Sequence, residues 1–575
     1  MAQQRTQRFR PLRTTNARHP IAVIERDFPP LPLRLCAFAR VILLFFLFVS
    51  PAFAARVERL IDNWRPEHYT VNLTLNDQLS EIASAQATIN ILILKQTTLI
   101  DLDFGELTTD KVTLNSKSLT FTHKDGKLDI TLPAPATPGT RLTLVIDYHG
   151  KPKDGLILTA DKDGKPAAIG DNWPNRVHHW IPSLDHPSAK ATVTFNVTAP
   201  ANQEVVANGR LDHVETTGNG QRTWTFSEGA PIPPYCMIVG VGQFARLEPS
   251  ERALTPMSYY VPLSDREFAL KGFSPAIPTI EFFTKTVAPY PYEKLALIVG
   301  ATRFGGMENS SAIVFTSTMF NRNAQAGLSK TYGIPFNNVT LIAHEIAHQW
   351  FGDSVTESTW SDVWLSEGFA TYFAGLFVQR YEGEDAFRRY MAGAATNVFA
   401  FEKRALKPIF DRDTPELLSL LNANSYQKGA WVLHMLRSNL GDDAFFRGIR
   451  NYYDAHKNAT ASTEDLRVAL EKASRKDLRS FFARWVYDSG HPQYELKWYW
   501  LGQKELRVVL TQTQAGNAFS DAVPIAISLA SGKREVVLKP TGKLFIERIP
   551  LREKPTSVEV DPRNVLLDEA TVKGS

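Results

Sequence analysis

The 575-residue sequence contains few cysteines and no long hydrophobic run. Its only cysteines are Cys36 and Cys236, and no internal repeat or low-complexity tract follows residue 55. The longest apolar run, VILLFFLFV at residues 41–49, is shorter than the about 20 residues that span a membrane. These absences exclude a disulfide scaffold and a repeat protein. The length instead indicates a large globular chain of about three or four domains.

The apolar run is typical of a secretory signal. Two arginines precede it, and the small-x-small sequence AFA at residues 52–54 follows it, which is the order found in a signal peptide. We expect cleavage after Ala54 or Ala55, so that residues 1–55 form a signal peptide with a long basic front. The protein is then exported, to the periplasm or outside the cell, and is anchored to a membrane only if the signal is retained.

The mature chain also lacks a strong charge of either sign. The signal holds eight of the 64 basic residues and two of the 60 acidic ones, so 56 basic and 58 acidic residues remain, a net charge of −2. No basic cluster with interleaved aromatic residues appears, and we expect no nucleic-acid partner. Cys236 is alone in the mature chain, which excludes an intramolecular disulfide. The oligomeric state is not indicated.

Hydropathy patterning divides the mature chain into three parts. Residues 56–248 alternate with period two, as in ATVTFNVT (191–198), and predict a β-sheet domain. Residues 249–491 are mostly helical, and residues 492–575 return to alternation and predict a small β-sandwich. The fold class is therefore multidomain α+β. Helices are expected over residues 276–288, 338–351, 362–381, 384–404, 425–439, 442–457, 463–473 and 476–488.

One expected helix carries three side chains that suit metal chemistry. The stretch NNVTLIAHEIAHQWFG (337–352) contains His344, Glu345 and His348 in the order His-Glu-x-x-His. Residues four apart lie on one face of a helix, so both imidazoles can bind one zinc ion. Glu345 can then take a proton from water, whose pKa zinc lowers to about 7. The alternative is an ordinary amphipathic helix, since the motif occurs by chance in roughly one such chain in a hundred.

A third ligand distinguishes these alternatives, because catalytic zinc takes three protein ligands and keeps one open position. The segment SDVWLSEGFATYF (361–373) offers Glu367, nineteen residues after His348. Glu367 lies between Leu365 and Phe369 on an otherwise apolar helix. A solvated carboxylate near a helix N-terminus is the other interpretation. We interpret the two segments together as a zinc site.

These residues, with WSDVWLSEGFATY (360–372) and FGGMEN (304–309), resemble the aminopeptidase N family of gluzincin metallopeptidases, which also includes leukotriene hydrolase. The resemblance covers most of residues 65–490 and, more loosely, the C-terminal part. It implies an N-terminal β-saddle, a thermolysin-like catalytic domain, one zinc ion per chain, and removal of the N-terminal residue from peptides that have a free N-terminus.

The resemblance also implies roles for single residues in catalysis. Glu345 would be the proton acceptor. Tyr426, in the segment ANSYQKGA (423–430), would stabilise the oxyanion of the tetrahedral intermediate. A core tyrosine with a satisfied hydroxyl is the alternative for Tyr426.

The resemblance implies that residues 304–309, which precede the helix with the two histidines, bind the substrate. The family's Gly-x-Met-Glu-Asn strand lies along the peptide, which here gives Gly305, Gly306 and Met307 a place beside the substrate. Glu308 would bind the free α-amino group, since a carboxylate pairs well with an ammonium. Phe304 would shape the first side-chain pocket. A tight turn is the alternative for the two glycines.

The sequence departs from the family at two places. Trp173 in DNWP (171–174) replaces the Gln or Glu that usually helps to hold the amine, and Asp171 or Asn172 are candidates to substitute for it. The chain also ends at Ser575 without the large helical domain of many members. We therefore expect an open cleft, or one closed by a second subunit.

Two functions of other classes stay open. A non-peptidase zinc hydrolase of the leukotriene type would keep the same metal ligands. A catalytically silent peptide-binding protein would be expected to lack one of the catalytic residues, and none is lacking. Histidines without a partner at ligand spacing are interpreted as structural: His178, His179, His186 and His434.

Overall fold

The computed structural model describes residues 56–574 apart from Val57, Leu60, Asn219, Ser250, Arg252, residues 321–326 and Gln503. The signal predicted over residues 1–55 lies outside the described residues. Within the described part of the chain, no helix is both long enough and apolar enough to cross a membrane.

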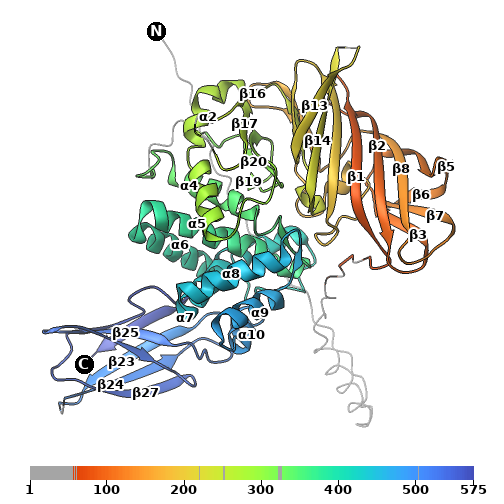
Figure 1. The fold of residues 1–575 in the computed structure, drawn as a ribbon. Coiled ribbons are helices and arrows are strands. Elements are labelled where there is room, and N and C mark those ends of the chain that lie inside the picture. Colours follow the sequence, from red (N-terminus) through yellow and green to blue (C-terminus); the bar gives the residue numbers. More distant parts are fainter. Residues whose placement is uncertain are drawn as a thin grey trace, which may run out of the picture. The chain divides into compact units, whose positions relative to one another are not determined.

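The N-terminal part consists of β-strands in three sheets, as the alternating pattern predicts (Figure 1). In β11 every second residue is buried, so that one face of the sheet is apolar. The eight-stranded sheet contains, in spatial order, β13 (Arg210–Thr216), β14 (Gln221–Ile232), β11 (Ala191–Pro200), β1 (Trp64–Leu75), β2 (Ile82–Ile93), β8 (Arg141–Gly150), β4 (Thr108–Leu114) and β5 (Lys117–Ser118). The smaller sheets are β12 (Glu204–Ala207), β15 (Val239–Gly242), β10 (Pro166–Gly170) and β9 (Leu156–Ala160), and β3 (Thr97–Asp103), β7 (Lys127–Ala136) and β6 (Thr120–Lys124).

A five-stranded sheet follows, and four of its strands lie after residue 248, where the sequence pattern predicted mainly helices. Its order is β16 (Phe244–Leu247), β17 (Met257–Pro262), β18 (Leu295–Gly300), β20 (Ala312–Thr316) and β19 (Gly306–Met307). All six residues of β18 are buried, and β18 pairs in parallel with both of its neighbours. A parallel strand covered on both faces is continuously apolar and does not alternate, which explains why the period-two pattern missed it. β19 is at the edge of this sheet.

Each expected helix has a counterpart in the structure, and one of them is divided into two elements. The segment expected as a helix over 425–439 is a single π-helical turn (Asn424–Lys428) followed by α7. The last expected helix is shorter than predicted, and α2 (Arg266–Gly272) is an additional helix. The helices are α3 (Ala276–Thr286), α4 (Phe336–His348), α5 (Trp364–Glu382), α6 (Glu384–Glu402), α7 (Gly429–Leu440), α8 (Asp442–His456), α9 (Thr463–Ser474) and α10 (Arg479–Trp485).

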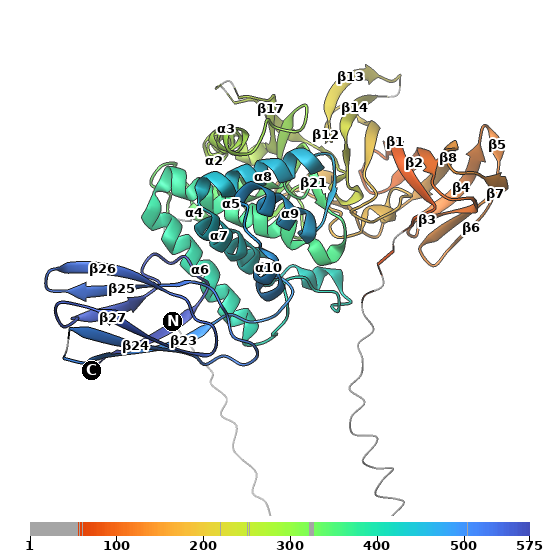
Figure 2. The same ribbon diagram turned by 60° about the horizontal axis from the view of Figure 1, so that its bottom comes forward.

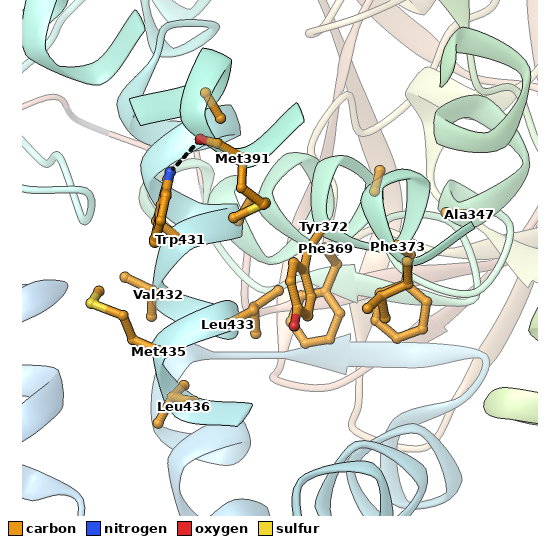
Figure 3. Packing of buried hydrophobic residues seen from close by; sticks show 14 of the residues in the cluster. Ala347, Phe369, Tyr372, Phe373, Met391, Trp431, Val432, Leu433, Met435 and Leu436 are labelled. Carbon is orange, nitrogen blue, oxygen red and sulfur yellow. Dashed lines mark hydrogen bonds between the residues drawn. The ribbon is translucent and has the colours of Figure 1, made fainter. Parts of the chain in front are cut away.

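α5 is the central helix of this part. Its residues from Trp364 to Val378 are all buried, as expected of a helix that is apolar on every side. Figure 3 shows Phe369 and Tyr372 of α5 beside Leu433 of α7, in the apolar cluster that these helices share. The Trp431 indole of α7 donates to the Met391 carbonyl of α6 (3.0 Å). A carboxylate on such a helix, Glu367, needs a compensating partner because it lies away from water.

Two glycines bring α5 and α7 into backbone contact, and we predict that Gly368→Ala destabilises the fold. An added Cβ on Gly368 would lie 2.9 Å from the Gly429 Cα and 3.2 Å from the Ser425 carbonyl oxygen. The helices would have to separate, which costs about 1–3 kcal/mol of unfolding free energy. Chemical denaturation measures this.

Gly393→Ala is the matched control, because Gly393 lies in α6 with nothing within 4 Å of its added Cβ. It should be neutral or stabilise by up to about 1 kcal/mol. Equal effects of the two substitutions would contradict the close helix contact.

The C-terminal part holds two further sheets (Figure 2). They account for the alternation that the sequence shows over residues 492–575. One sheet contains β27 (Leu544–Pro550), β24 (Glu505–Gln512), β23 (Gln493–Trp500) and β29 (Glu569–Gly574). The other contains β26 (Gly532–Leu538), β25 (Val523–Leu529) and β28 (Ser557–Val560).

Candidate active site

A cavity of about 490 Å³ is lined by residues of α4, α5, α6, β19 and the π-helical turn. All ten residues that the sequence predicts for the site line it: Phe304, Gly305, Gly306, Met307, Glu308, His344, Glu345, His348, Glu367 and Tyr426. These residues are spread over more than 100 positions of the chain, from Phe304 to Tyr426. The fold therefore brings the whole predicted set together in one place.

Three side chains converge on one point of the cavity. The Nε2 atoms of His344 and His348 lie 3.0 Å apart, and Glu367 Oε2 lies 3.2 Å from the first and 3.4 Å from the second. The two histidines come from successive turns of α4, and Glu367 comes from the first turn of α5, which packs beside α4 (Figure 1).

The surrounding hydrogen bonds orient these side chains. His348 Nδ1 lies 3.1 Å from the Phe351 carbonyl oxygen and 3.0 Å from the Ser366 hydroxyl, which leaves Nε2 to face the cavity. The other carboxylate oxygen of Glu367, Oε1, accepts a hydrogen bond from the Tyr426 hydroxyl (2.8 Å). Glu367 Oε2 is buried and faces the Nε2 atoms of the two histidines, without hydrogen-bond geometry to either one or to any other described residue.

This arrangement fits a tetrahedral metal ion. Ligand atoms about 2.0–2.1 Å from one tetrahedral ion are about 3.3 Å apart, close to the three separations observed. A buried carboxylate oxygen without a partner is costly unless something binds it. Two imidazoles and one carboxylate form a donor set of catalytic zinc sites. The residues present therefore could hold a metal ion, with His344, His348 and Glu367 as ligands.

Two further carboxylates, Glu345 and Glu308, lie beside this group. Ligand atoms of Glu308, Glu345 and His348 are all within 4.8 Å of one another. Burial raises the pKa of Glu345 well above its ordinary value and the pKa of Glu308 to about 7. None of the described residues that line the cavity is Lys or Arg. A bound cation would offset this concentration of carboxylates.

The Glu345 carboxylate lies against the edge strand β19. An added Cβ on Gly306 would be 2.3 Å from the Cδ atom of Glu345, whereas at Gly305 the nearest atom would be in Leu341, at 3.6 Å. Among the strands that the structure describes, Gly306 and Met307 pair with β20 alone. The other edge of β19 has no strand partner among them and offers its backbone groups to a peptide.

Tyr426 lies on the π-helical turn, with its ring against His344. Its ring stacks on His344, with ring centroids 5.8 Å apart and an angle of 10° between the planes. Burial raises the pKa of the Tyr426 hydroxyl well above its ordinary value, so that it stays a donor. The fully buried Lys428 braces the turn, because its ammonium donates to Glu402 Oε1 (2.7 Å) and to the Gly490 carbonyl (2.9 Å).

Trp173 lines the cavity, but Asp171 and Asn172, the two residues before it, do not. The Trp173 ring meets Phe304 edge to face, at 6.3 Å between centroids. Asp171 is bound by the Arg176 guanidinium (3.0 Å) and the Arg303 backbone amide (2.9 Å). Asn172 donates to the Met237 carbonyl and accepts from Trp180. Both candidates to replace the missing Gln or Glu are thus occupied by other partners.

Two of the histidines interpreted as structural bind groups outside the cavity. His178 lies 2.8 Å from Asp185, and the Nε2 atom of His434 lies 3.2 Å from the Asn564 carbonyl. Among the described residues, the groups that could hold a metal are the two in this cavity.

Sequence reasoning missed Gln349, whose side chain is fully buried next to the site. Its position directly after His348 did not indicate a role in the site. Its contacts connect segments 41 residues apart, which no local pattern reveals.

Comparison with known proteins identifies two family domains. A family model described as the Peptidase M1 N-terminal domain matches residues 65–236, and one described as the Peptidase family M1 domain matches residues 272–485. The second match contains His344, Glu345, His348, Glu367 and Tyr426.

Individual relatives extend this result. Probable aminopeptidase 2 of Sulfurisphaera tokodaii is 29% identical, over 61% of this chain and 45% of the relative. Tricorn protease-interacting factor F2 of Thermoplasma acidophilum is 27% identical, over 77% and 56%. Aminopeptidase 2 of Candida albicans is 26% identical, over 86% and 55%. The chain thus spans about half the length of these curated relatives. Taken with the two family domains, these similarities show that the chain belongs to peptidase family M1, the aminopeptidase N family of gluzincin metallopeptidases.

Proposed function

We propose that the protein is a zinc-dependent aminopeptidase that removes the N-terminal residue from peptides. One observation carries the proposal: the cavity that holds the three metal-binding side chains also holds two further buried carboxylates, Glu345 and Glu308, beside an edge strand. Peptide hydrolysis needs one carboxylate to move a proton. Recognition of a free N-terminus needs another to pair with the ammonium group.

His344, His348 and Glu367 would hold one zinc ion per chain. When bound, zinc supplies a Lewis acid that polarises a carbonyl group and lowers the pKa of water. Glu345 takes the proton of the attacking water and returns it to the leaving amine, for which its place against β19 is suitable. The Tyr426 hydroxyl, which now donates to Glu367, provides the hydrogen bond for the developing oxyanion.

The substrate would lie along β19. A peptide backbone can bind the free edge of this strand at Gly306 and Met307. The α-ammonium group then pairs with Glu308, and the first side chain lies towards Phe304 and Trp173, which line the same cavity.

Glu308→Ala is expected to lower kcat/KM for a leucyl amide about 10- to 100-fold, because a hydrogen bond to a charged group contributes about 1.5–3 kcal/mol. The zinc content should not change, since Glu308 is outside the group formed by His344, His348 and Glu367. Steady-state kinetics and metal analysis of the same preparation measure both. An unchanged kcat/KM would remove Glu308 from amine recognition.

The experiment that tests the function is hydrolysis of a panel of aminoacyl amides and of their N-acetylated counterparts. We expect cleavage of the free-amine substrates alone, lost with a chelator and restored by zinc. Cleavage of the blocked substrates would indicate an endopeptidase. Binding of zinc without any cleavage would favour a leukotriene-type hydrolase or a silent binding protein.

We also propose the boundaries and the type of each domain. We assign a signal peptide to residues 1–55, a β-saddle to 56–248, a thermolysin-like catalytic domain to 249–491 and a β-sandwich to 492–575. The sandwich is supported by the two C-terminal sheets, whose strands β23, β24 and β25 contribute Leu496, Val508 and Ile525 to an apolar cluster that also includes the helices.

Export, to the periplasm or outside the cell, is proposed on the signal alone. The membrane would be a partner only through a retained signal. N-terminal sequencing of the exported protein should begin at Ala55 or Arg56, and a start within residues 1–40 would contradict cleavage.

A further inference from the structure

The side chain of Gln349 joins the end of α4 to the segment that carries Glu308. Its Nε2 atom donates to the Glu308 carbonyl oxygen (2.7 Å), and its Oε1 atom accepts from the Ser311 backbone amide (2.8 Å). Gln349 directly follows the ligand candidate His348 and is fully buried. A single amide therefore connects the metal-binding helix with both ends of the four-residue segment 308–311.

The orientation of this amide is fixed by two further hydrogen bonds. Gln349 Nε2 also donates to Asp353 Oδ2 (2.8 Å), and Oε1 also accepts from the Tyr290 hydroxyl (3.0 Å). Both N–H groups and both lone pairs of the amide are then used. A flipped amide would place its NH₂ group against the Ser311 N–H and its oxygen against the Asp353 carboxylate, so only one orientation satisfies the network.

Other side chains bind the two segments that Gln349 joins, one at Asp353 and one at Ser311. The Lys190 ammonium donates to the Asp353 carbonyl (2.7 Å), and the Cys236 thiol donates to Asp353 Oδ1 (3.2 Å). On the other side, Lys294 donates to the Ser311 carbonyl (2.7 Å). Gln349 thus lies between two anchored segments and sets their separation.

We infer that Gln349 is a positioning residue for substrate recognition: it fixes the Glu308 segment at the distance from the metal ligands that a bound N-terminal residue requires. The inference rests on the proposed function, in which Glu308 binds the α-ammonium group. Misplacement of a binding group by about 1 Å can cost about 100-fold in rate. Asparagine is one methylene too short to reach both backbone groups, and glutamate lacks the N–H donor for the Glu308 carbonyl.

The test uses two zinc-binding inhibitors that differ only in the amino group, leucine hydroxamate and its des-amino analogue. Their dissociation constants for the zinc-loaded protein are measured by calorimetry. Gln349→Met should weaken leucine hydroxamate about tenfold or more, because the amine contact is misplaced, and the analogue less than about threefold. Gln349→Asn serves if the Met variant does not fold, and should shift the ratio in the same direction.

A double-mutant cycle then asks whether Gln349 acts through Glu308. In a Glu308→Ala background, Gln349→Met should change the affinity for leucine hydroxamate by less than about twofold, since the partner is already lost. An undiminished effect in this background, or equal weakening of both inhibitors by Gln349→Met, would overturn the inference.

Gln512→Met is the matched control. Gln512 is also a buried glutamine that donates to and accepts from backbone groups, both of Phe519 (2.7 and 2.8 Å), but it lies in β24. Its substitution should leave the ratio of the two affinities unchanged. Failure of the proposed function is a separate outcome: the unsubstituted protein would then bind both hydroxamates equally.

Discussion

Glu345→Gln is expected to lower kcat for a leucyl amide by about 10³- to 10⁴-fold, the largest effect of any single substitution considered. Glutamine has the shape of glutamate but cannot accept the proton of the attacking water. The fold should be retained, because the buried side chain keeps its volume and its place against Gly306. Steady-state kinetics with leucyl amides measure the loss.

Zinc binding separates this loss of catalysis from a loss of the site. Glu345 is not one of the three converging side chains, so the variant should still bind one zinc ion per chain. Glu281→Gln, on the exposed face of α3, is the control and should leave kcat unchanged. If the Glu345 variant keeps more than about a tenth of the activity, another group moves the proton.

Tyr426→Phe should lower kcat about 10²- to 10³-fold and change KM by less than about threefold. A donor to the oxyanion acts mainly in the transition state, and removal of one such donor has this magnitude. The phenylalanine ring can keep the stack on His344, so the zinc site should persist. The kcat and KM values for leucyl amides and the zinc content of the same preparation measure this.

Tyr390 provides a matched control on the same cavity. Its hydroxyl donates to the Thr371 carbonyl (2.9 Å) rather than to a ligand candidate. Tyr390→Phe should change kcat by less than about threefold. Equal effects of the two substitutions would contradict a specific role of Tyr426. A loss of zinc in Tyr426→Phe would instead assign its hydroxyl to the support of Glu367, to which it donates in the structure.

The two histidines and Glu345 could be predicted from the sequence because their relative positions depend only on spacing within one helix. His344, Glu345 and His348 lie on successive turns of one helix, where spacing alone determines the shared face. Glu367 was predicted from the need of catalytic zinc for a third ligand, whereas Tyr426 required the family resemblance. The distance between α4, α5 and the π-helical turn depends on packing, which no local spacing gives. That packing includes the contact of Gly368 with Gly429, which no period in the sequence indicates.

The five-stranded sheet and Gln349 show what the sequence left out. β18 is buried along its whole length, so its apolar run carries no alternation. The Gln349 amide connects positions 308, 311 and 353, and such long-range hydrogen bonds follow from the tertiary fold alone. The helix expected over 425–439 was predicted in type, but its first turn is π-helical and carries Tyr426. Local propensity does not distinguish these two kinds of turn.

We propose above all that one zinc ion, held by His344, His348 and Glu367, is required for removal of an N-terminal residue. The most direct test is titration of the metal-free protein with zinc, while bound zinc and hydrolysis of a leucyl amide are recorded together. Activity should rise in proportion to bound zinc and saturate at one ion per chain. Hydrolysis by the metal-free protein, or one bound zinc ion without hydrolysis of any free-amine substrate, would contradict this proposal.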